Sequence, residues 1–354
     1  MNKYKQNLKS TIILSFVLII LSFSLASAKI IRFTHAPRLN FEINNTYDDN
    51  IFLYSPDYIA DFKNQIRSYR FPISTYDDFI TNLYFSLVFP LHSGLYKSSL
   101  NLYYKQYLYA VNGEKSYQII SANMNQSVAK QISLEAAYLF LPRYLIRYYQ
   151  DPIASSTHFI GCTFAEHLFT FGLSYKLQNI QIKPYGRFEI DRYKENFSFY
   201  NGHAIRYGMD LNWSIGSLAN LNLGVDRKQN SAKGPLPDIS YDDNAVSVQI
   251  LTRVLNLDKL YFNLGADYTK RFYTTENSAS IDPFHRDRID TKFSFAGGLE
   301  YRFSKNLRLN LEYNREIRKV SSPNLSNIDD IKNYNNNKLT LGLRFNLSKL
   351  TGGD

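Results

Sequence analysis

The stretch Asn337–Leu347, N-K-L-T-L-G-L-R-F-N-L, has an apolar residue at every second position. One side of the extended chain carries Leu339, Leu341, Leu343, Phe345 and Leu347, and the other carries Lys338, Thr340, Gly342, Arg344 and Asn346. A period of two predicts a β-strand with one apolar and one polar face. A strand of a soluble sandwich and a strand of a membrane wall share this pattern, so the rest of the chain has to decide between them.

The first 28 residues have the pattern of an export signal. Three lysines in the first ten residues precede an apolar run over residues 11–25, and Ala26-Ser27-Ala28 follows with small residues at its ends. This order predicts a secretory signal peptide cleaved after Ala28. An uncleaved anchor is the alternative, but the run is short for the ~20 residues that a membrane-spanning helix needs. We expect residues 29–354 to form one domain.

The composition favours strands and a membrane interface. Tyr occurs 29 times and Phe 25 times, whereas Trp and Cys occur once each. Aromatic residues suit strands, and Tyr is common in the girdles of membrane barrels. The single Cys162 cannot form an internal disulfide. The formal net charge is +10 without a compact basic run, which argues against a nucleic-acid partner.

About fourteen segments show the alternating pattern, and their connections are sorted by length. Short connections follow the even-numbered segments, and mostly longer ones follow the odd-numbered segments. Such sorting is typical of a closed antiparallel transmembrane β-barrel with short periplasmic turns and longer extracellular loops. An even strand count returns both ends of the chain to the periplasmic side. The segments are 38–48, 79–91, 97–111, 116–126, 130–147, 158–177, 179–193, 203–214, 218–228, 243–254, 260–272, 290–303, 306–318 and 336–347.

The end of the last segment resembles an assembly signal. Thr340-x-Gly342-x-x-Phe345-x-Leu347 resembles the C-terminal β-signal of bacterial outer-membrane proteins. Over nearly all of its mature length, the chain resembles the general class of single-chain, porin-like outer-membrane β-barrels. The resemblance implies a place in the bacterial outer membrane, among its lipid and lipopolysaccharide, and recognition by the barrel-assembly machinery.

Charged residues between the apolar ones are expected to face the lumen. The basic residues of this set slightly outnumber the acidic ones, so a positive lumen that favours anions is one interpretation. An internal salt-bridge network that stiffens the wall is the other. The basic set is Arg143, Arg147, Arg187, Arg206, Arg253, Arg302, Arg308, Arg344, Lys183 and Lys292, and the acidic set is Glu42, Glu135, Glu189, Asp210, Asp267, Glu300 and Glu312.

The longest connection, residues 49–78, contains a helix signal. Ser55-Pro56-Asp57 has Pro at the first helical position, and Tyr58, Ile59, Phe62 and Ile66 follow at helical spacing. The helix could fold into the lumen as a constriction or lie on the rim.

Two acidic pairs flank this connection, Asp48-Asp49 and Asp77-Asp78. Their carboxylates could hold a divalent ion that bridges to lipopolysaccharide. Alternatively, the aspartates end strands through turn chemistry beside girdle tyrosines. No other metal or cofactor site is expected.

Closure of the barrel requires the last strand to pair with the first. In that arrangement Glu42 and Arg344 lie on the lumen face at similar heights. They either form a cross-strand ion pair or point separately into lumen water.

The expected function is a channel for small hydrophilic solutes. A hydrophobic-substrate transporter is an alternative, although only about ten residues precede the first strand, which leaves little for a plug. A structural or surface-binding barrel with a closed lumen is a third hypothesis. The six histidines are scattered, and no HExxH or Ser/His/acid arrangement appears, so an enzyme is not expected.

Overall fold

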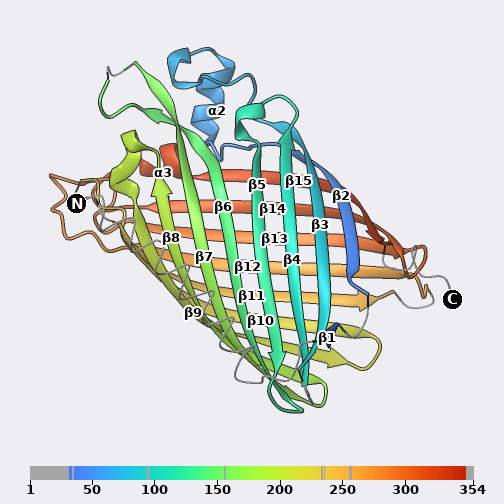
Figure 1. The fold of residues 1–354 in the computed structure, drawn as a ribbon. Helices are drawn as coiled ribbons and strands as arrows, with labels where there is room; N and C mark the ends of the chain where they lie inside the picture. Colours follow the sequence, from blue (N-terminus) through green and yellow to red (C-terminus); the bar gives the residue numbers. More distant parts are fainter. Residues whose placement is uncertain are drawn as a thin grey trace.

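The structure is a computed structural model, and it describes residues 32–33, 36–93, 96–154, 157–232, 234, 236–254 and 257–347. The signal peptide predicted for residues 1–28 lies outside these residues. The described chain forms one antiparallel sheet that curves round and closes on itself (Figure 1). No helix among the described residues is long and apolar enough to cross a membrane.

Fourteen long strands make up the wall, as the alternating segments predict. Their ends differ from the predicted ends by at most four residues. The strands are β2 (Arg38–Asp48), β3 (Asp78–Ser93), β4 (Tyr96–Tyr109), β5 (Tyr117–Ser127), β6 (Ile132–Gln150), β7 (Phe159–Leu177), β8 (Ile180–Tyr193), β9 (Gly202–Ile215), β10 (Ala219–Ala232), β11 (Tyr241–Arg253), β12 (Leu260–Tyr273), β13 (Ile289–Arg302), β14 (Leu307–Ser321) and β15 (Tyr334–Asn346).

The first and last long strands close the barrel. β15 pairs antiparallel with β2, with Arg344 opposite Glu42. The two-residue strand β1 (Arg32–Phe33) pairs with β3 beyond the start of β2, so it prolongs that edge and adds no further strand to the wall. With both edges paired, the backbone of the wall satisfies its own hydrogen bonds, as a membrane requires. The predicted closed antiparallel barrel is confirmed.

The connections divide the barrel into a short-turn end and a long-loop end. Two residues link β7 to β8, whereas residues 49–77 link β2 to β3 and residues 274–288 link β12 to β13. The long connections all lie at one end, in agreement with the predicted sorting. They carry the short helices α2 (Pro56–Lys63), η1 (Ser68–Arg70), η2 (Gly113–Lys115), η3 (Glu195–Tyr200) and α3 (Ile328–Lys332).

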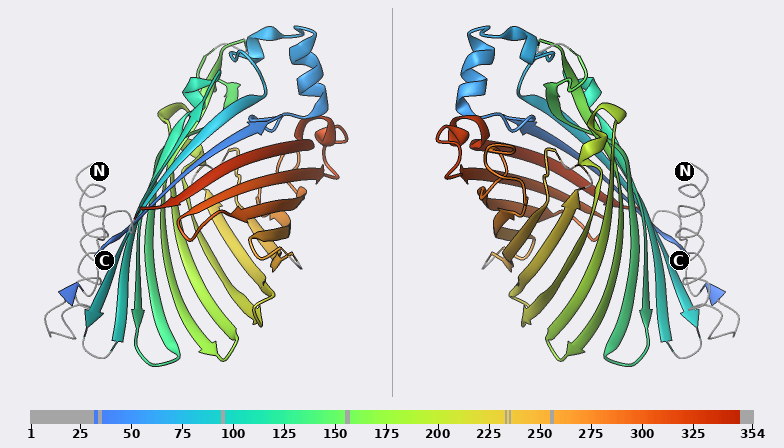
Figure 2. Two further views of the ribbon diagram at one scale, coloured as in Figure 1. Left: turned by 90° about the vertical axis from the view of Figure 1, so that its right-hand side faces the viewer. Right: turned by 90° about the vertical axis from the view of Figure 1, so that its left-hand side faces the viewer.

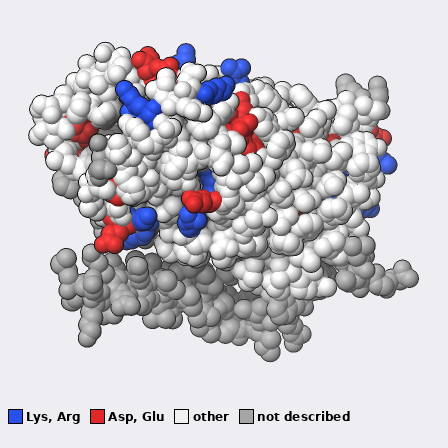
Figure 3. All heavy atoms as spheres, turned by 90° about the horizontal axis from the view of Figure 1, so that it is seen from above, with Lys and Arg blue, Asp and Glu red and all other residues white. Residues whose placement is uncertain are grey.

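The two faces of the wall differ as the alternation predicts. Outward residues such as Phe293 and Leu341 are large, apolar and exposed, with about half of Leu341 accessible. Inward residues such as Ser294 and Asn336 are polar and buried. Seen from the side on which α2 lies, acidic and basic side chains are interspersed, and much of the remaining described surface is uncharged (Figure 3).

The helix predicted in the first long loop forms on the rim. Its N-cap is Ser55, whose Oγ accepts a hydrogen bond from the backbone N of Tyr58 at 3.3 Å, and Pro56 opens the helix. None of the residues of α2 is buried. Figure 2 shows α2 standing beyond the ends of the strands. The structure therefore places this helix on the rim, which is the second of the two predicted positions.

The segment just before α2 is the part of this loop that enters the mouth of the barrel. Phe52 and Tyr54 are each only 2% exposed, and they belong to a buried cluster that includes Leu145 of β6. Lys115 lies beneath them, with its Nζ 4.9 Å from the centre of the Phe52 ring. The mouth is thus narrowed by residues 51–54 and not by the helix.

Candidate functional site

The lumen face at the short-turn end surrounds a cavity of about 660 Å³. All sixteen lining residues are polar or charged, with four basic against two acidic. They come from β2, β3, β4, β14 and β15 and from the turn before β14. They are Asn40, Glu42, Asn44, Thr46, Asn82, Tyr84, Lys105, Tyr107, Lys305, Asn306, Arg308, Asn310, Glu312, Thr340, Arg344 and Asn346.

The closing seam crosses this cavity, and polar contacts bridge it. Arg344 donates from Nε to Glu42 Oε2 at 2.6 Å, and Asn44 donates to the other carboxylate oxygen at 2.9 Å. Further from the short-turn end of the seam, the hydroxyls of Thr46 and Thr340 lie 2.9 Å apart. The structure therefore brings Glu42 and Arg344 together across the seam, where their register makes them direct neighbours.

The residues of the predicted assembly signal occupy different positions on the last strand. Thr340 and Gly342 face the lumen, and a Cβ at Gly342 would overlap the side-chain oxygens of Asn44 and Asn310. Phe345 faces outward and stacks on Phe41 of β2, with ring centres 6.1 Å apart. Leu347 lies one residue beyond the end of β15. A glycine at 342 leaves room for the side chains of its two register partners, Asn44 on β2 and Asn310 on β14.

Most of the basic residues predicted for the lumen have an acidic partner. Arg206 lies 3.7 Å from Glu189 and 3.1 Å from Asp226. Arg187 differs, because its guanidinium lies over the ring of Tyr185, 4.6 Å from the centre, and no ion pair of Arg187 occurs among the described residues. The remaining pairs are Lys183 with Glu135, Arg302 with Glu300 at 2.6 Å, Arg308 with Glu300 at 3.6 Å, Lys292 with Glu316 at 3.5 Å and Arg253 with Asp258 at 3.3 Å. Glu312 lines the short-turn cavity. These contacts fit the predicted salt-bridge network.

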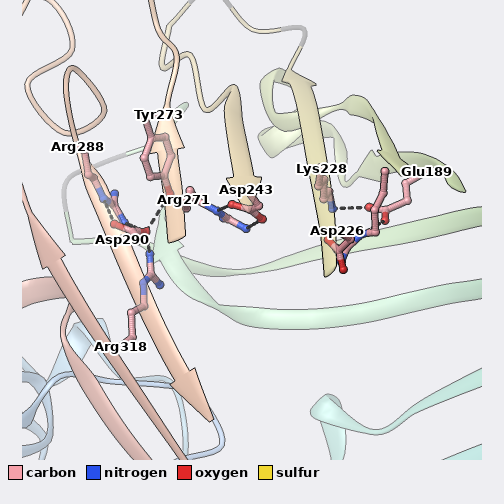
Figure 4. Close-up of polar contacts among 10 residues, drawn as sticks. Glu189, Asp226, Lys228, Asp243, Arg271, Tyr273, Arg288, Asp290 and Arg318 are labelled. Carbon is pink, nitrogen blue, oxygen red and sulfur yellow. Dashed lines mark hydrogen bonds and ion pairs between the residues drawn. The ribbon is translucent and has the colours of Figure 1, made fainter. Parts of the chain in front are cut away.

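A charged row runs across five adjacent strands, and most of it was not predicted. Successive register partners from β9 to β13 are Arg206, Lys228, Asp243, Arg271 and Asp290. The Arg271 guanidinium binds Asp243 through two hydrogen bonds of 2.8 and 2.9 Å, and its Cζ lies 3.5 Å from the centre of the Tyr241 ring. Figure 4 shows Lys228, Asp243, Arg271 and Asp290 of this row on the wall.

Both ends of the row continue into further ion pairs. At the β9 end, Arg206 and its neighbour Lys228 both pair with Glu189 on β8. Asp290 accepts from both Arg288, at 2.7 and 2.9 Å, and Arg318. A cavity of about 340 Å³ opens onto the row, with five basic and three acidic residues in its lining. The row lies between the short-turn cavity and the loops.

A third cavity, of about 550 Å³, fills the mouth at the long-loop end. Its lining comes from opposite walls of the barrel and from several loops, and it contains five lysines or arginines against two aspartates. It is lined by Ile51, Phe52, Leu53, Tyr144, Ile146, Arg147, Tyr149, Cys162, Asp191, Tyr193, Tyr200, Asn230, Pro237, Ile239, Tyr241, Arg271, Tyr273, Asp282, Phe284, His285, Arg288, Arg318 and Lys332.

The four rim aspartates are held by protein donors. Asp48 pairs with Lys338 at 3.2 Å, and Asp78 accepts from the backbone N of Asn112 at 2.7 Å. Asp49 accepts from Asn337 at 2.6 and 2.7 Å, and Asp77 accepts from the Tyr47 hydroxyl at 2.8 Å. Among the described residues, no three Asp, Glu, His or Cys side chains form a group that could hold a metal ion. These contacts correspond to the alternative interpretation, in which the aspartates complete strand ends and turns.

Comparisons with known proteins agree with this architecture. A family model described as "Outer membrane protein beta-barrel domain" matches residues 153–345, more than half of the chain. A search of curated protein sequences found no match.

Solved structures also align with the chain. OmpT, an outer membrane protein of Vibrio cholerae, is 8% identical with a TM-score of 0.47, and the match covers 89% of this chain and 99% of that one. The outer membrane protein OpdK from Pseudomonas aeruginosa is 9% identical with a TM-score of 0.38, over 88% and 99%. OccAB3 from Acinetobacter baumannii is 13% identical with a TM-score of 0.41, over 88% and 98%. All three scores lie below 0.5, so the fold assignment rests on the strand pairing and the family match.

Proposed function

The chain belongs to the outer membrane protein beta-barrel family, and from this premise we propose that it is a channel for small hydrophilic solutes that favours anions. In this proposal the export signal is cleaved after Ala28 and residues 29–354 form the barrel. The short-turn end faces the periplasm, and the long loops face outside. Partners are the barrel-assembly machinery, lipid, lipopolysaccharide and the solutes, and nucleic acid is not among them.

The short-turn cavity is the observation that carries the proposal. Its lining is polar or charged at every position, which suits water and hydrophilic solutes. A hydrophobic substrate would lose hydration there without gaining apolar contacts. The lining therefore favours a hydrophilic channel over a hydrophobic-substrate transporter.

The balance of charge supports a preference for anions. Basic residues exceed acidic ones by two in the short-turn cavity, by two beside the charged row and by three in the mouth. Ion pairs engage most of the acidic residues and much of the basic charge, so they stiffen the wall while leaving a positive surplus. A pore with such a surplus attracts anions and repels cations.

A closed structural barrel is the second candidate. The observation that favours it is the packing of residues 51–54 in the mouth, where Phe52 and Tyr54 are almost completely buried. In this alternative the lumen passes nothing, and the loops bind at the cell surface. We propose no catalytic activity in either case, because charged lumen groups are largely engaged in ion pairs and not arranged around a nucleophile.

Planar-bilayer recording of the purified, refolded protein tests the proposal. We expect discrete conductance steps in potassium chloride and, under a salt gradient, a reversal potential of the sign that chloride selectivity gives. Replacing Arg308 by Gln should reduce this selectivity, because that side chain lines the short-turn cavity. The matched control is Lys319→Gln, since Lys319 on β14 is exposed on the outer face. A correctly folded protein without conductance steps would favour the closed barrel.

A further inference from the structure

The cavity in the mouth contains two basic side chains without an acidic partner. Arg147 of β6 lines the cavity, and its Nε is buried without a hydrogen-bond partner. Lys332 ends α3 and lines the same cavity from the loop side. Neither forms an ion pair or a hydrogen bond among the described residues. Burying polar groups of this kind is costly unless something pairs with them.

The surroundings of Lys332 are strongly positive. Burial lowers the pKa of Lys332 well below its usual range, and the nearby guanidiniums of Arg147, Arg288 and Arg318 lower it further. Arg288 and Arg318 share the single carboxylate of Asp290. Two guanidiniums on one carboxylate leave positive charge uncompensated. The acidic groups that line the cavity, Asp191 and Asp282, are fewer than the basic ones.

The same cavity is walled by aromatic rings. Tyr144, Tyr149, Tyr193, Tyr200 and Tyr273 line it together with Phe52. The lining therefore joins a cluster of hydrogen-bond donors to a large apolar surface, and its volume lies in the range of sites for small molecules. A bare inorganic anion would use only the donors.

We propose that this cavity is a binding site for small organic carboxylates. Arg147 and Lys332 bind the carboxylate, and the apolar body of the solute lies against the tyrosine rings. Arg147 suits this role because a guanidinium can donate two parallel hydrogen bonds to one carboxylate. The inference deepens the proposed function and rests on it, since it names the solutes that the channel would capture on entry from the long-loop end.

Isothermal titration calorimetry of the refolded, full-length mature barrel with three probe compounds tests the site. Benzoate has both the charge and the apolar body, acetate has the charge alone, and benzyl alcohol has the body alone. We expect benzoate to bind at least about tenfold more tightly than either of the others, since each lacks one set of contacts. Equal affinity for benzoate and acetate, or for benzoate and benzyl alcohol, would overturn the inference.

Two variants and a control assign the binding to these side chains. Arg147→Gln and Lys332→Met should each weaken benzoate binding about tenfold or more, because each removes a charge-assisted hydrogen bond. Lys319→Met removes the same charge from the outer face of the neighbouring strand β14 and should leave the affinity unchanged. A difference in gel mobility between unheated and heated samples establishes that each variant has folded. Folded variants that bind benzoate like the unaltered protein would refute the assignment.

Bilayer recording separates this inference from the proposed function. Conductance steps in a protein that does not bind benzoate would overturn the site and leave the channel standing. Benzoate binding by a protein without conductance would support the site while the channel function fails.

Discussion

The two ends of the lumen are built in different ways. At the short-turn end, the cavity is lined by residues of five strands and one tight turn, and no long loop contributes. At the long-loop end, the cavity is lined by strands together with residues 51–53, 200, 237, 239, 282–288 and 332, which come from five different loops. One barrel therefore contains a cavity made by its wall and a cavity made by its loops.

This difference shows which forces define each cavity. The short-turn cavity follows from alternation and register, because each inward position is fixed once the strands pair. The mouth cavity depends on contacts between segments far apart in sequence, such as Phe52 against Tyr148, whose ring centres lie 6.1 Å apart. Strand pairing alone would leave the mouth open.

The largest expected effect concerns the two ends themselves. Tags inserted near Ser278 and Asn327, in the long loops, should be reachable by antibody on intact cells. Tags at Ser217 or Ser304, in the short turns, should be reachable only after the outer membrane is permeabilised. Labelling of the short turns alone on intact cells would reverse the assignment of the two ends.

The next effect tests the two faces of the wall near the short-turn end. Leu311→Arg places a charge on the outer face, where Leu311 is 45% exposed, and it should cost ~2–4 kcal/mol if the residue lies near the bilayer midplane. Asn310→Arg extends into the polar cavity and should cost much less. Urea unfolding in lipid vesicles measures both. Equal losses would contradict the face assignment.

A pH effect on stability should arise at the long-loop end. Burial lowers the pKa of Lys115 to about 7, and its Nζ donates to the carbonyls of Leu145 and Ile146 at 2.8 and 3.0 Å. A neutral amine can supply both hydrogen bonds. The unfolded chain holds a proton on this lysine up to its ordinary pKa of about 10.4, so stability should rise between about pH 7 and 10 by up to about 1.4 kcal/mol per pH unit.

Lys115→Met should reduce this rise, as measured by urea unfolding across that pH range, and the remainder should come from Lys332, whose pKa is also lowered. The control Lys259→Met, in a short turn where the side chain is exposed, should retain it. An unchanged pH dependence in Lys115→Met would mean that the buried lysine keeps its ordinary pKa.

The smallest effect concerns the seam. Glu42 and Arg344 are direct register partners, but half of the Arg344 side chain is exposed. A double-mutant cycle with Glu42→Gln and Arg344→Gln should give a coupling of about 0.2–1 kcal/mol. A coupling of zero would show that the contact adds nothing to the register that the strands already set.

The wall could be predicted from the sequence because its signal is local. Alternation located all fourteen strands, and it also predicted that Glu42 and Arg344 would face the lumen at similar heights. Within the charged row, Asp243 and Arg271 are joined through a short turn, so counting outward from that turn would have paired them. Arg271 and Asp290 are joined through a long loop, so no count of this kind could have aligned them.

The mouth could not be predicted in the same way, for two physical reasons. Two β-bulges in β6 break the alternation between Leu141 and Tyr144 and between Leu145 and Tyr148. As a result Tyr144 and Tyr149, five residues apart, both line the cavity, which unbroken alternation forbids. The entry of residues 51–54 into the mouth depends on buried aromatic packing, and no short-range pattern encodes that.

The seam between β2 and β15 has a consequence for biosynthesis. Its contacts join residues almost three hundred positions apart, as in the pair Thr46 and Thr340. The ring can therefore form only after translation has supplied β15, and loop-closure entropy makes such long-range pairing slow. A chain truncated before β15 would keep two unpaired strand edges, which favour aggregation. Only a complete polypeptide can therefore form the closed barrel, and an incomplete one keeps its unpaired edges.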